Sequence, residues 1–196
     1  MNYDIYLVGA RGQGILTIGE ILTEAIRQKG MPINFFPSKR MAQRGGFVKT
    51  QVRIGRNEAG PNIPEKGADL VIAMELGEAM KAIRFARPGG DFLLFGDRWI
   101  PVTGILGKET YPQVENIQEQ VRLADARLLY FAYECLPVWK GQLIPSNLFL
   151  LGAAMRQTPL GGLVRREAVI EAIRRRWEKS FQPNRFAFES RYTTAF

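Results

Sequence analysis

The chain contains no histidine, and Cys135 is the only cysteine among its 196 residues. Without histidine it has no histidine-based catalytic triad, no histidine general base and no histidine-ligated zinc site of its own. A single cysteine excludes an internal disulfide, and it excludes an iron–sulfur cluster held by this chain alone. We therefore expect no metal site. Sparse cysteine is typical of a reducing, cytoplasmic compartment. Nothing in the surrounding sequence marks Cys135 as a reactive thiol, so we expect it in the core.

Long apolar runs are also missing. No stretch approaches the roughly 18 consecutive apolar residues that a membrane-spanning helix needs. The first residues lack the basic segment and apolar stretch of a secretory leader, so we expect a cytoplasmic protein. The apolar share of 46% is too high for a disordered chain. With no internal repeat and no linker, the length predicts one domain over residues 1–196.

The first 26 residues predict a strand, a glycine-rich turn and a helix. Residues 3–8 are aromatic and β-branched, as a buried strand should be. Apolar residues then recur at helical spacing over residues 15–26, and Gly30 follows as a helix-ending residue. Such a unit usually opens a parallel sheet with helices on its faces.

The turn between them contains five candidate binding residues: Gly9, Arg11, Gly12, Gln13 and Gly14. Glycines beside a helix N-terminus let an anion approach backbone N–H groups, so phosphate binding is one interpretation. The order G-x-x-G-x-G differs from the dinucleotide fingerprint G-x-G-x-x-G, and no P-loop occurs. The other interpretation is a tight turn that needs positive φ and close helix packing. Both stay open at this point.

Residues 32–36 predict a second strand, which ends at Pro37 and Ser38. A dinucleotide-binding fold would place an acidic residue there to hold a ribose hydroxyl, whereas this chain has Lys39 and Arg40. Two cations could suit a phosphorylated ribose, so a free-standing NADP-binding oxidoreductase stays open as an alternative. We favour a basic surface or subunit-contact loop.

A second unusual turn follows, with Arg44, Gly45 and Gly46 at its end. Paired glycines after an arginine predict a bend that presents a guanidinium, which suits carboxylate or phosphate recognition. Residues 47–54 then alternate in polarity and predict a half-exposed strand, antiparallel or at an edge.

The rest of the chain alternates between strands and helices. Apolar runs at residues 70–74 and 91–95 predict buried parallel strands, and helical patterns cover residues 75–86, 115–136, 148–155 and 165–179. This alternation predicts an α/β fold: a three-layer, Rossmann-like open sheet, mostly parallel, with helices on both faces. Glu75 would meet ligands at the carboxyl edge of that sheet, or would interact with the following helix N-terminus, which we favour. The aromatic tail 182–196 should pack on this chain or on a partner.

The net charge is +8, and basic residues cluster at 39–56 and 165–179. A basic helix over 165–179 could bind nucleic acid, which remains an alternative function. Because its charges share a helix with an apolar stripe, a solvated face is the simpler explanation.

Several motifs in order resemble one family. The Gly9–Gly14 turn, Pro37-Ser38 and the run 41–46 (Met-Ala-Gln-Arg-Gly-Gly) ahead of a strand resemble the gamma domain of 2-oxoacid:ferredoxin oxidoreductases. The closest likeness is to the beta subunit of indolepyruvate ferredoxin oxidoreductase. Ala68-Asp69-Leu70, and Asn147 with 151–153 (Leu-Gly-Ala), look like later landmarks. The resemblance extends over residues 1–179.

The resemblance implies a subunit that carries no cluster and is inactive alone. In such complexes a catalytic subunit carries thiamine diphosphate and iron–sulfur clusters, 2-oxoacids are decarboxylated to acyl-CoA with coenzyme A, and ferredoxin accepts the electrons. The two turns, with Arg11 and Arg44, would then lie close together at the carboxyl end of the sheet, where they would face the catalytic subunit or carry part of an anionic ligand such as coenzyme A. Gln13 could hydrogen-bond a partner or its own turn. Indolepyruvate subunits tend to have an acidic residue, a histidine and a glycine where this chain has residues 38–40 (Ser-Lys-Arg), so the 2-oxoacid stays open.

Overall fold

The fold is built on a six-stranded sheet in a computed structural model that describes residues 1–38, 47–96 and 111–192. Its strands lie in the order β2-β3-β1-β4-β5-β6. Only β3 runs against the other five, because it pairs antiparallel with both β1 and β2. The predictions of a mostly parallel sheet and of an antiparallel strand over residues 47–54 are thus confirmed. The strands are β1 (Tyr3–Ala10), β2 (Ile33–Ser38), β3 (Phe47–Ile54), β4 (Ala68–Ala73), β5 (Ala86–Phe95) and β6 (Arg127–Phe131).

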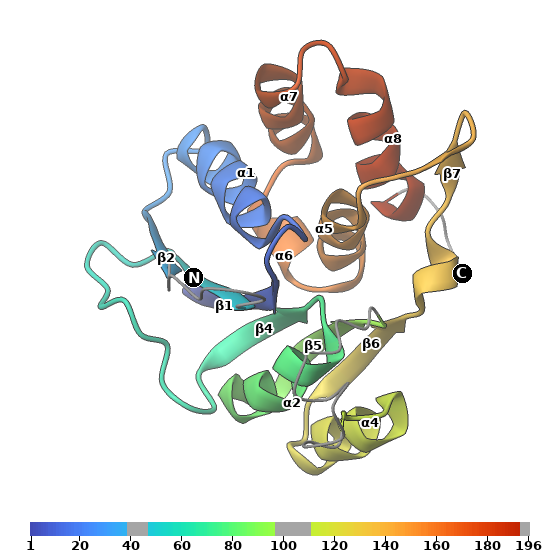
Figure 1. The fold of residues 1–196 in the computed structure, drawn as a ribbon. Helices are drawn as coiled ribbons and strands as arrows, with labels where there is room; N and C mark the ends of the chain where they lie inside the picture. The colour runs from blue at the N-terminus through green and yellow to red at the C-terminus, as the bar shows by residue number, and fades with distance from the viewer. Residues whose placement is uncertain (39–46, 97–110, 193–196) are drawn as a thin grey trace.

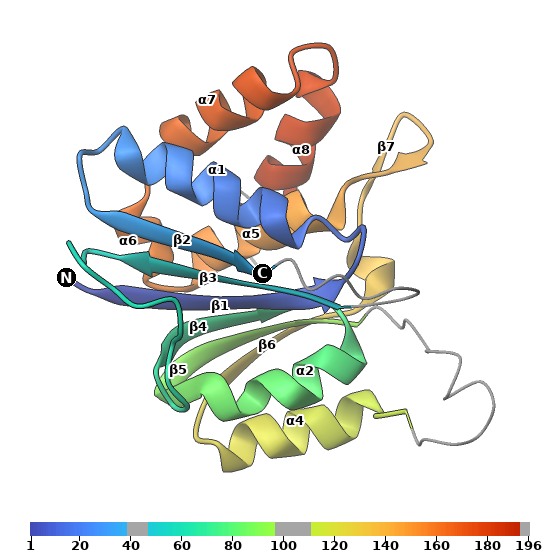
Figure 2. The same cartoon turned by 60° about the vertical axis from the view of Figure 1, so that its left-hand side comes forward.

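Helices cover both faces of this sheet, which confirms three layers (Figures 1 and 2). Alternate residues of β1 point into two separate cores: Ile5 and Leu7 into one, Tyr6 and Val8 into the other. Among the described residues no helix has the length and apolarity to cross a membrane. One layer holds α1 (Ile15–Arg27), α5 (Ser146–Gln157), α6 (Leu160–Leu163), α7 (Arg166–Arg176) and α8 (Phe181–Tyr192); the other holds α2 (Leu76–Ala82) and α4 (Val114–Leu123).

The helix predicted over residues 115–136 is wrong. The helix α4 ends at Leu123, Asp125 takes a left-handed φ of 56°, and the chain then forms strand β6. Leu128 packs against one core and Phe131 into the other, so their spacing of three residues reflects a strand that contacts a core on each face. The core position predicted for Cys135 is also wrong. It follows β6 in the short 3-10 helix η2 (Tyr133–Cys135) and is exposed.

The aromatic tail is helical up to Tyr192. It forms α8, which packs closely on α5. Of the two predicted alternatives, packing on this chain or on a partner, packing on this chain is observed. A Cβ placed on Gly152 of α5 would lie 2.1 Å from the carbonyl oxygen of Phe188, so a glycine is needed where the helices meet. The two smallest strands, β7 (Val138–Trp139) and β8 (Gln142–Leu143), form a separate hairpin between η2 and α5.

Candidate functional site at the carboxyl edge of the sheet

The glycine turn lies at the carboxyl end of β1, beside the end of β4. From these two neighbouring strands the chain turns to opposite faces: α1 follows β1 on one side, and α2 follows β4 on the other (Figures 1 and 2). Open α/β sheets bind ligands at such a switch point, outside the carboxyl ends of the strands. The predicted position of residues 9–14 at this edge is confirmed.

Gln13 holds the turn together from inside. Its Oε1 accepts a hydrogen bond from the Ala10 N–H at 2.7 Å, and its Nε2 donates to the Met74 carbonyl oxygen at 2.9 Å. The side chain therefore ties the end of β1 to the residue that follows β4. A Cβ on Gly9 would lie 2.6 Å from Gln13 Oε1, so Gly9 makes room for this amide. Of the two roles considered for Gln13, the bond to its own turn is the one observed.

The other two glycines have left-handed backbones. Gly12 has a φ of 95° and Gly14 a φ of 79°, values that residues other than glycine seldom adopt. A Cβ on Gly14 would lie 2.2 Å from Asn147 Nδ2, at the start of α5. No described atom lies within 4 Å of the corresponding position on Gly12. The tight-turn interpretation thus accounts for the positive φ of Gly12 and Gly14 and for the close packing at Gly9 and Gly14, whereas the space beside Gly12 is open.

The two helices at this switch point differ in how their N-termini are satisfied. Helix α2 is capped by Glu75, whose carboxylate accepts hydrogen bonds from the Gly77 N–H at 2.9 Å and the Glu78 N–H at 2.8 Å. The Tyr111 hydroxyl also donates to Glu75. Glu75 is buried and acts as a helix cap, the role we favoured. The N-cap residue of α1 is Gly14, so no side chain caps this helix. Its N-terminus is the one that can accept an anion or a partner's carboxylate.

Positive charge stands next to that N-terminus. Arg11 is exposed, and within the described part of the chain it forms no ion pair. On the α2 side, burial raises the pKa of Glu78, and Lys81, 2.7 Å away, opposes the shift. The Lys81 ammonium also lies 4.3 Å from the centre of the Phe47 ring, which is 47% exposed. The edge therefore combines an exposed aromatic ring with a cation that no described carboxylate pairs.

The second predicted turn lies outside the described residues, so the structure tests none of Arg44, Gly45 and Gly46. The same holds for Lys39 and Arg40, on which the NADP-binding alternative depended. Phe47, the first described residue after this stretch, pairs with Ala10 at the end of β1. The two turns thus border neighbouring strands, and their predicted proximity stays a prediction.

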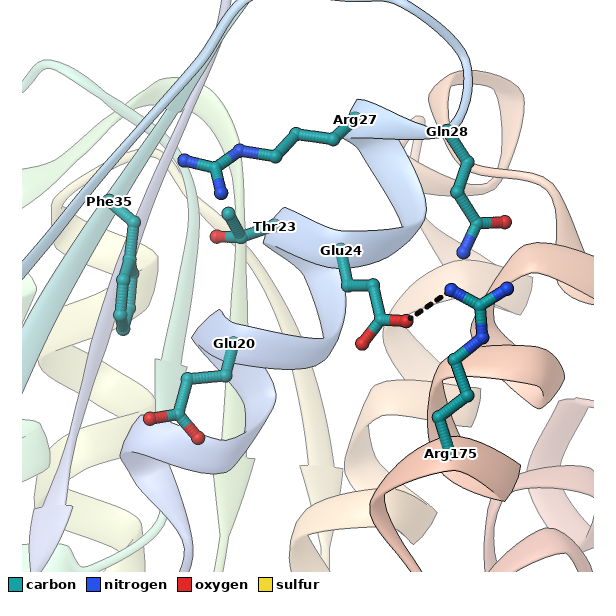
Figure 3. A pocket seen from close by; sticks show the side chains of 7 residues that line it. All are labelled: Glu20, Thr23, Glu24, Arg27, Gln28, Phe35 and Arg175. Atoms are coloured by element: carbon teal, nitrogen blue, oxygen red, sulfur yellow. Dashed lines mark hydrogen bonds and ion pairs between the residues drawn. The ribbon is translucent and has the colours of Figure 1, made fainter.

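The basic helix α7 offers little unpaired charge. Arg175 lies 3.3 Å from a Glu24 oxygen and 3.1 Å from a Glu171 oxygen, and Arg176 lies 2.7 Å from Glu20. The pairs with Glu20 and Glu24 join α7 to α1, beside a groove of about 700 Å³ that Figure 3 shows. The groove is lined by Glu20, Thr23, Glu24, Arg27, Gln28, Phe35 and Arg175. With two carboxylates among its walls, it does not resemble a polyanion-binding track. Within the described ranges no three metal-ligating side chains gather.

Comparison with known proteins identifies the family. A family model described as pyruvate ferredoxin/flavodoxin oxidoreductase matches residues 4–193. The chain belongs to this family. It is 34% identical over 174 residues to indolepyruvate oxidoreductase subunit IorB of Pyrococcus horikoshii, a match that covers 88% of this chain and 85% of the relative. The IorB subunit of Methanothermobacter thermautotrophicus is 32% identical over 89% of this chain and 87% of its own length. The predicted family is confirmed.

Solved structures share the fold of this pyruvate ferredoxin/flavodoxin oxidoreductase family member. A keto/oxoacid ferredoxin oxidoreductase gamma subunit from Geobacter sulfurreducens matches 97% of this chain and 96% of its own, with a TM-score of 0.65 and 24% identity. A 2-oxoglutarate:ferredoxin oxidoreductase from Magnetococcus marinus, solved with 2-oxoglutarate, coenzyme A and succinyl-CoA bound, matches 96% of this chain with a TM-score of 0.64 and 18% identity. There the match occupies only 30% of the longer chain.

Proposed function

We propose that this protein is the small subunit of a 2-oxoacid:ferredoxin oxidoreductase complex. Such a complex decarboxylates a 2-oxoacid, forms an acyl-CoA and passes the electrons to ferredoxin. The supporting observation is the family match over residues 4–193 together with 34% identity to an indolepyruvate oxidoreductase subunit. We expect no turnover from this chain alone.

The composition of the chain supports a division of labour between subunits. One cysteine and no histidine cannot supply the ligands of an iron–sulfur cluster. The residues present therefore do not fit a cluster, and we assign both the clusters and thiamine diphosphate to a larger catalytic subunit. Electron transfer and decarboxylation are accordingly functions of that partner.

The role of this chain in the complex would lie at the carboxyl edge of its sheet. Arg11 adds a cation beside the uncapped N-terminus of α1, and Gly12 leaves the backbone approachable. We propose that this turn, with Arg44, Gly45 and Gly46 alongside it, faces the catalytic subunit. There it would bind a carboxylate of that subunit or part of an anionic ligand such as coenzyme A.

The relatives indicate which 2-oxoacids the complex would use. The IorB relatives make indolepyruvate and other arylpyruvates the first 2-oxoacids to test. Residues 38–40 depart from the pattern of such subunits, so the screen should include pyruvate, 2-oxoglutarate and branched-chain 2-oxoacids.

Gentle affinity purification from the native cell tests this function. We expect a larger cysteine-rich subunit to co-purify, with iron and thiamine diphosphate in the eluate. The complex should reduce ferredoxin when a 2-oxoacid and coenzyme A are supplied together. Recovery of the chain alone, without iron, thiamine or 2-oxoacid-dependent reduction, would contradict the proposal.

A further inference from the structure

The β7–β8 hairpin is a firmly anchored projection. Leu136 before it and Ile144 after it are both buried in the larger core. The Trp139 ring packs on Phe186 of α8, with ring centres 4.7 Å apart. Left-handed backbones at Lys140 (φ 49°) and Gly141 (φ 81°) close the two-residue turn, as in tight hairpins whose twist matches that of the strands. Figure 1 shows the hairpin standing out beyond α8.

The projecting strands present apolar side chains to solvent. Val138 and Leu143 lie directly opposite each other in the hairpin and are 55% and 54% exposed. Tyr133 in η2, just before the hairpin, is 43% exposed although its ring lies 6.0 Å from that of Phe95. Four of the seven exposed large hydrophobic residues in the described ranges fall between 130 and 143, in and just before the hairpin. We call Tyr133, Val138 and Leu143 the hairpin surface.

The hairpin surface and the candidate site lie toward the same end of the sheet. Strand β8 leads within four residues to Asn147, whose Nδ2 lies 3.4 Å from the Gly14 carbonyl oxygen. Both the hairpin and the glycine turn therefore lie at the carboxyl end of the sheet, as Figure 2 shows. A partner that covers Arg11 and Gly12 can reach the hairpin without crossing to another face of the molecule.

We infer that the hairpin surface docks this chain onto the larger catalytic subunit, an inference that rests on the proposed function. In the Magnetococcus marinus oxidoreductase the matched region is 30% of a longer chain, so the same fold occurs there covalently joined to further protein. The Geobacter sulfurreducens gamma subunit, by contrast, is matched over 96% of its own chain, so the fold also occurs as a subunit with little further protein attached. Such a subunit must hold its partner through a non-covalent surface. The exposed Val138–Leu143 pair can form such a surface. Because the hairpin is anchored at both ends, binding through this pair loses little conformational entropy.

A second copy of this chain suits the hairpin poorly. A projecting apolar arm needs an apolar recess in its partner. On the described part of this chain, the groove of Figure 3 does not offer one, because charged and polar side chains such as Glu20, Glu24 and Arg175 make up most of its lining. The recess should therefore belong to the larger subunit, with apolar walls and carboxylates near Lys140 at the tip of the arm.

Co-expression of this chain with the catalytic subunit tests the inference. Val138→Lys and Leu143→Lys, singly and together, place charges on the surface without touching the turn or the anchors. We expect the double variant to bind the catalytic subunit at least about tenfold more weakly. Leu123→Lys is the matched control, because Leu123 is 62% exposed at the end of α4, just before β6 begins at the opposite edge of the sheet. It should bind as the wild type does. Circular dichroism would establish that each variant is folded.

The outcomes distinguish a failure of this inference alone from a failure of the proposed function. Wild-type binding that the double variant leaves within twofold would overturn the inference alone, and failure of the wild type to bind the catalytic subunit would overturn both. A wild-type homodimer that Val138→Lys and Leu143→Lys convert to a monomer, with subunit binding unchanged, would assign the hairpin surface to a second copy and overturn the inference.

Discussion

Gly14 and Asn147 interlock the glycine turn with α5, although 133 residues separate them in the chain. The Asn147 Nδ2 donates to the Gly14 carbonyl oxygen at 3.4 Å, and a Cβ on Gly14 would lie 2.2 Å from the same nitrogen. The turn that begins α1 is therefore shaped by the start of a helix from the other end of the sequence.

Gly14→Ala should lower the free energy of unfolding by about 2–4 kcal/mol, because it combines a left-handed backbone with a collision against Asn147. Gly12→Ala is the matched control. Gly12 has a similarly positive φ, but the space around its Cβ position is open. Gly12→Ala should therefore lower the free energy of unfolding by only about 1–2 kcal/mol. Urea unfolding of both variants measures the difference. Adding Asn147→Ala should recover part of the loss in Gly14→Ala, and equal losses at the two glycines would contradict the interlock.

Asp4→Asn should destabilise the amino edge of the sheet by about 3 kcal/mol, since Asp4 is 3% exposed and pairs with two arginines. Its oxygens lie 2.9 Å from Arg53 and 3.1 Å from Arg56. The Arg53 side chain is only 12% exposed, so it would lose its partner away from water. Thermal unfolding measures the effect. Arg122→Gln, which breaks an exposed pair with Glu119, should leave the Tm unchanged.

Glu78→Gln should stabilise the protein at pH 7. Burial raises the pKa of Glu78 above its ordinary value of 4.5, against the opposing effect of Lys81. The folded protein thus holds this proton more tightly than the unfolded chain. Stability from this residue is present below pH 4.5 and is lost as the pH rises through the folded-state pKa.

The gain in Glu78→Gln should therefore vanish below pH 4.5, where wild-type Glu78 is itself neutral. Urea unfolding at several pH values measures this. Arg122 lowers the pKa of Glu119, so Glu119→Gln should show no gain at pH 7. A gain in Glu78→Gln that is the same at every pH would contradict the burial argument.

Arg11→Glu should weaken assembly with the catalytic subunit by about tenfold without destabilising the chain, because Arg11 is exposed and forms no ion pair with a described residue. The loss should diminish at high salt, where exposed charges are screened. Arg156→Glu, an exposed control at the far end of α5, should assemble normally. Arg44→Glu should behave like Arg11→Glu if the two turns share the interface. Unchanged affinity and turnover in both would contradict the role proposed for this edge.

Local patterns predicted most of the sheet because they are strong at its centre. Residues 70–74 and 92–95, in and beside β4 and β5, are unbroken apolar runs. Residues 1–26 place a mainly apolar strand, a glycine turn and an apolar helical period in succession. Strand β6 was missed because Leu128 and Phe131 are three residues apart, a spacing that helices share. A clue was present in Asp125, a residue type that tolerates the left-handed turn found there.

The sequence predicted where the candidate site lies but not which contacts build it. The glycines indicated a turn at the carboxyl edge, and Glu75 indicated a helix start. No spacing rule reveals that Gln13 reaches Met74, because the two are 61 residues apart. The hairpin surface was also missed, since Val138 and Leu143 are ordinary apolar residues whose exposure depends on what lies beside them.

By itself, the sequence determined the fold class, the family and the chemistry that this chain cannot perform, because strand and helix periods and the absence of histidine are local or compositional properties. Only the tertiary structure decided which glycines are needed for packing, which arginines are neutralised and which apolar side chains face solvent. Those properties depend on neighbours that folding brings from distant parts of the chain, as Asn147 is brought to Gly14.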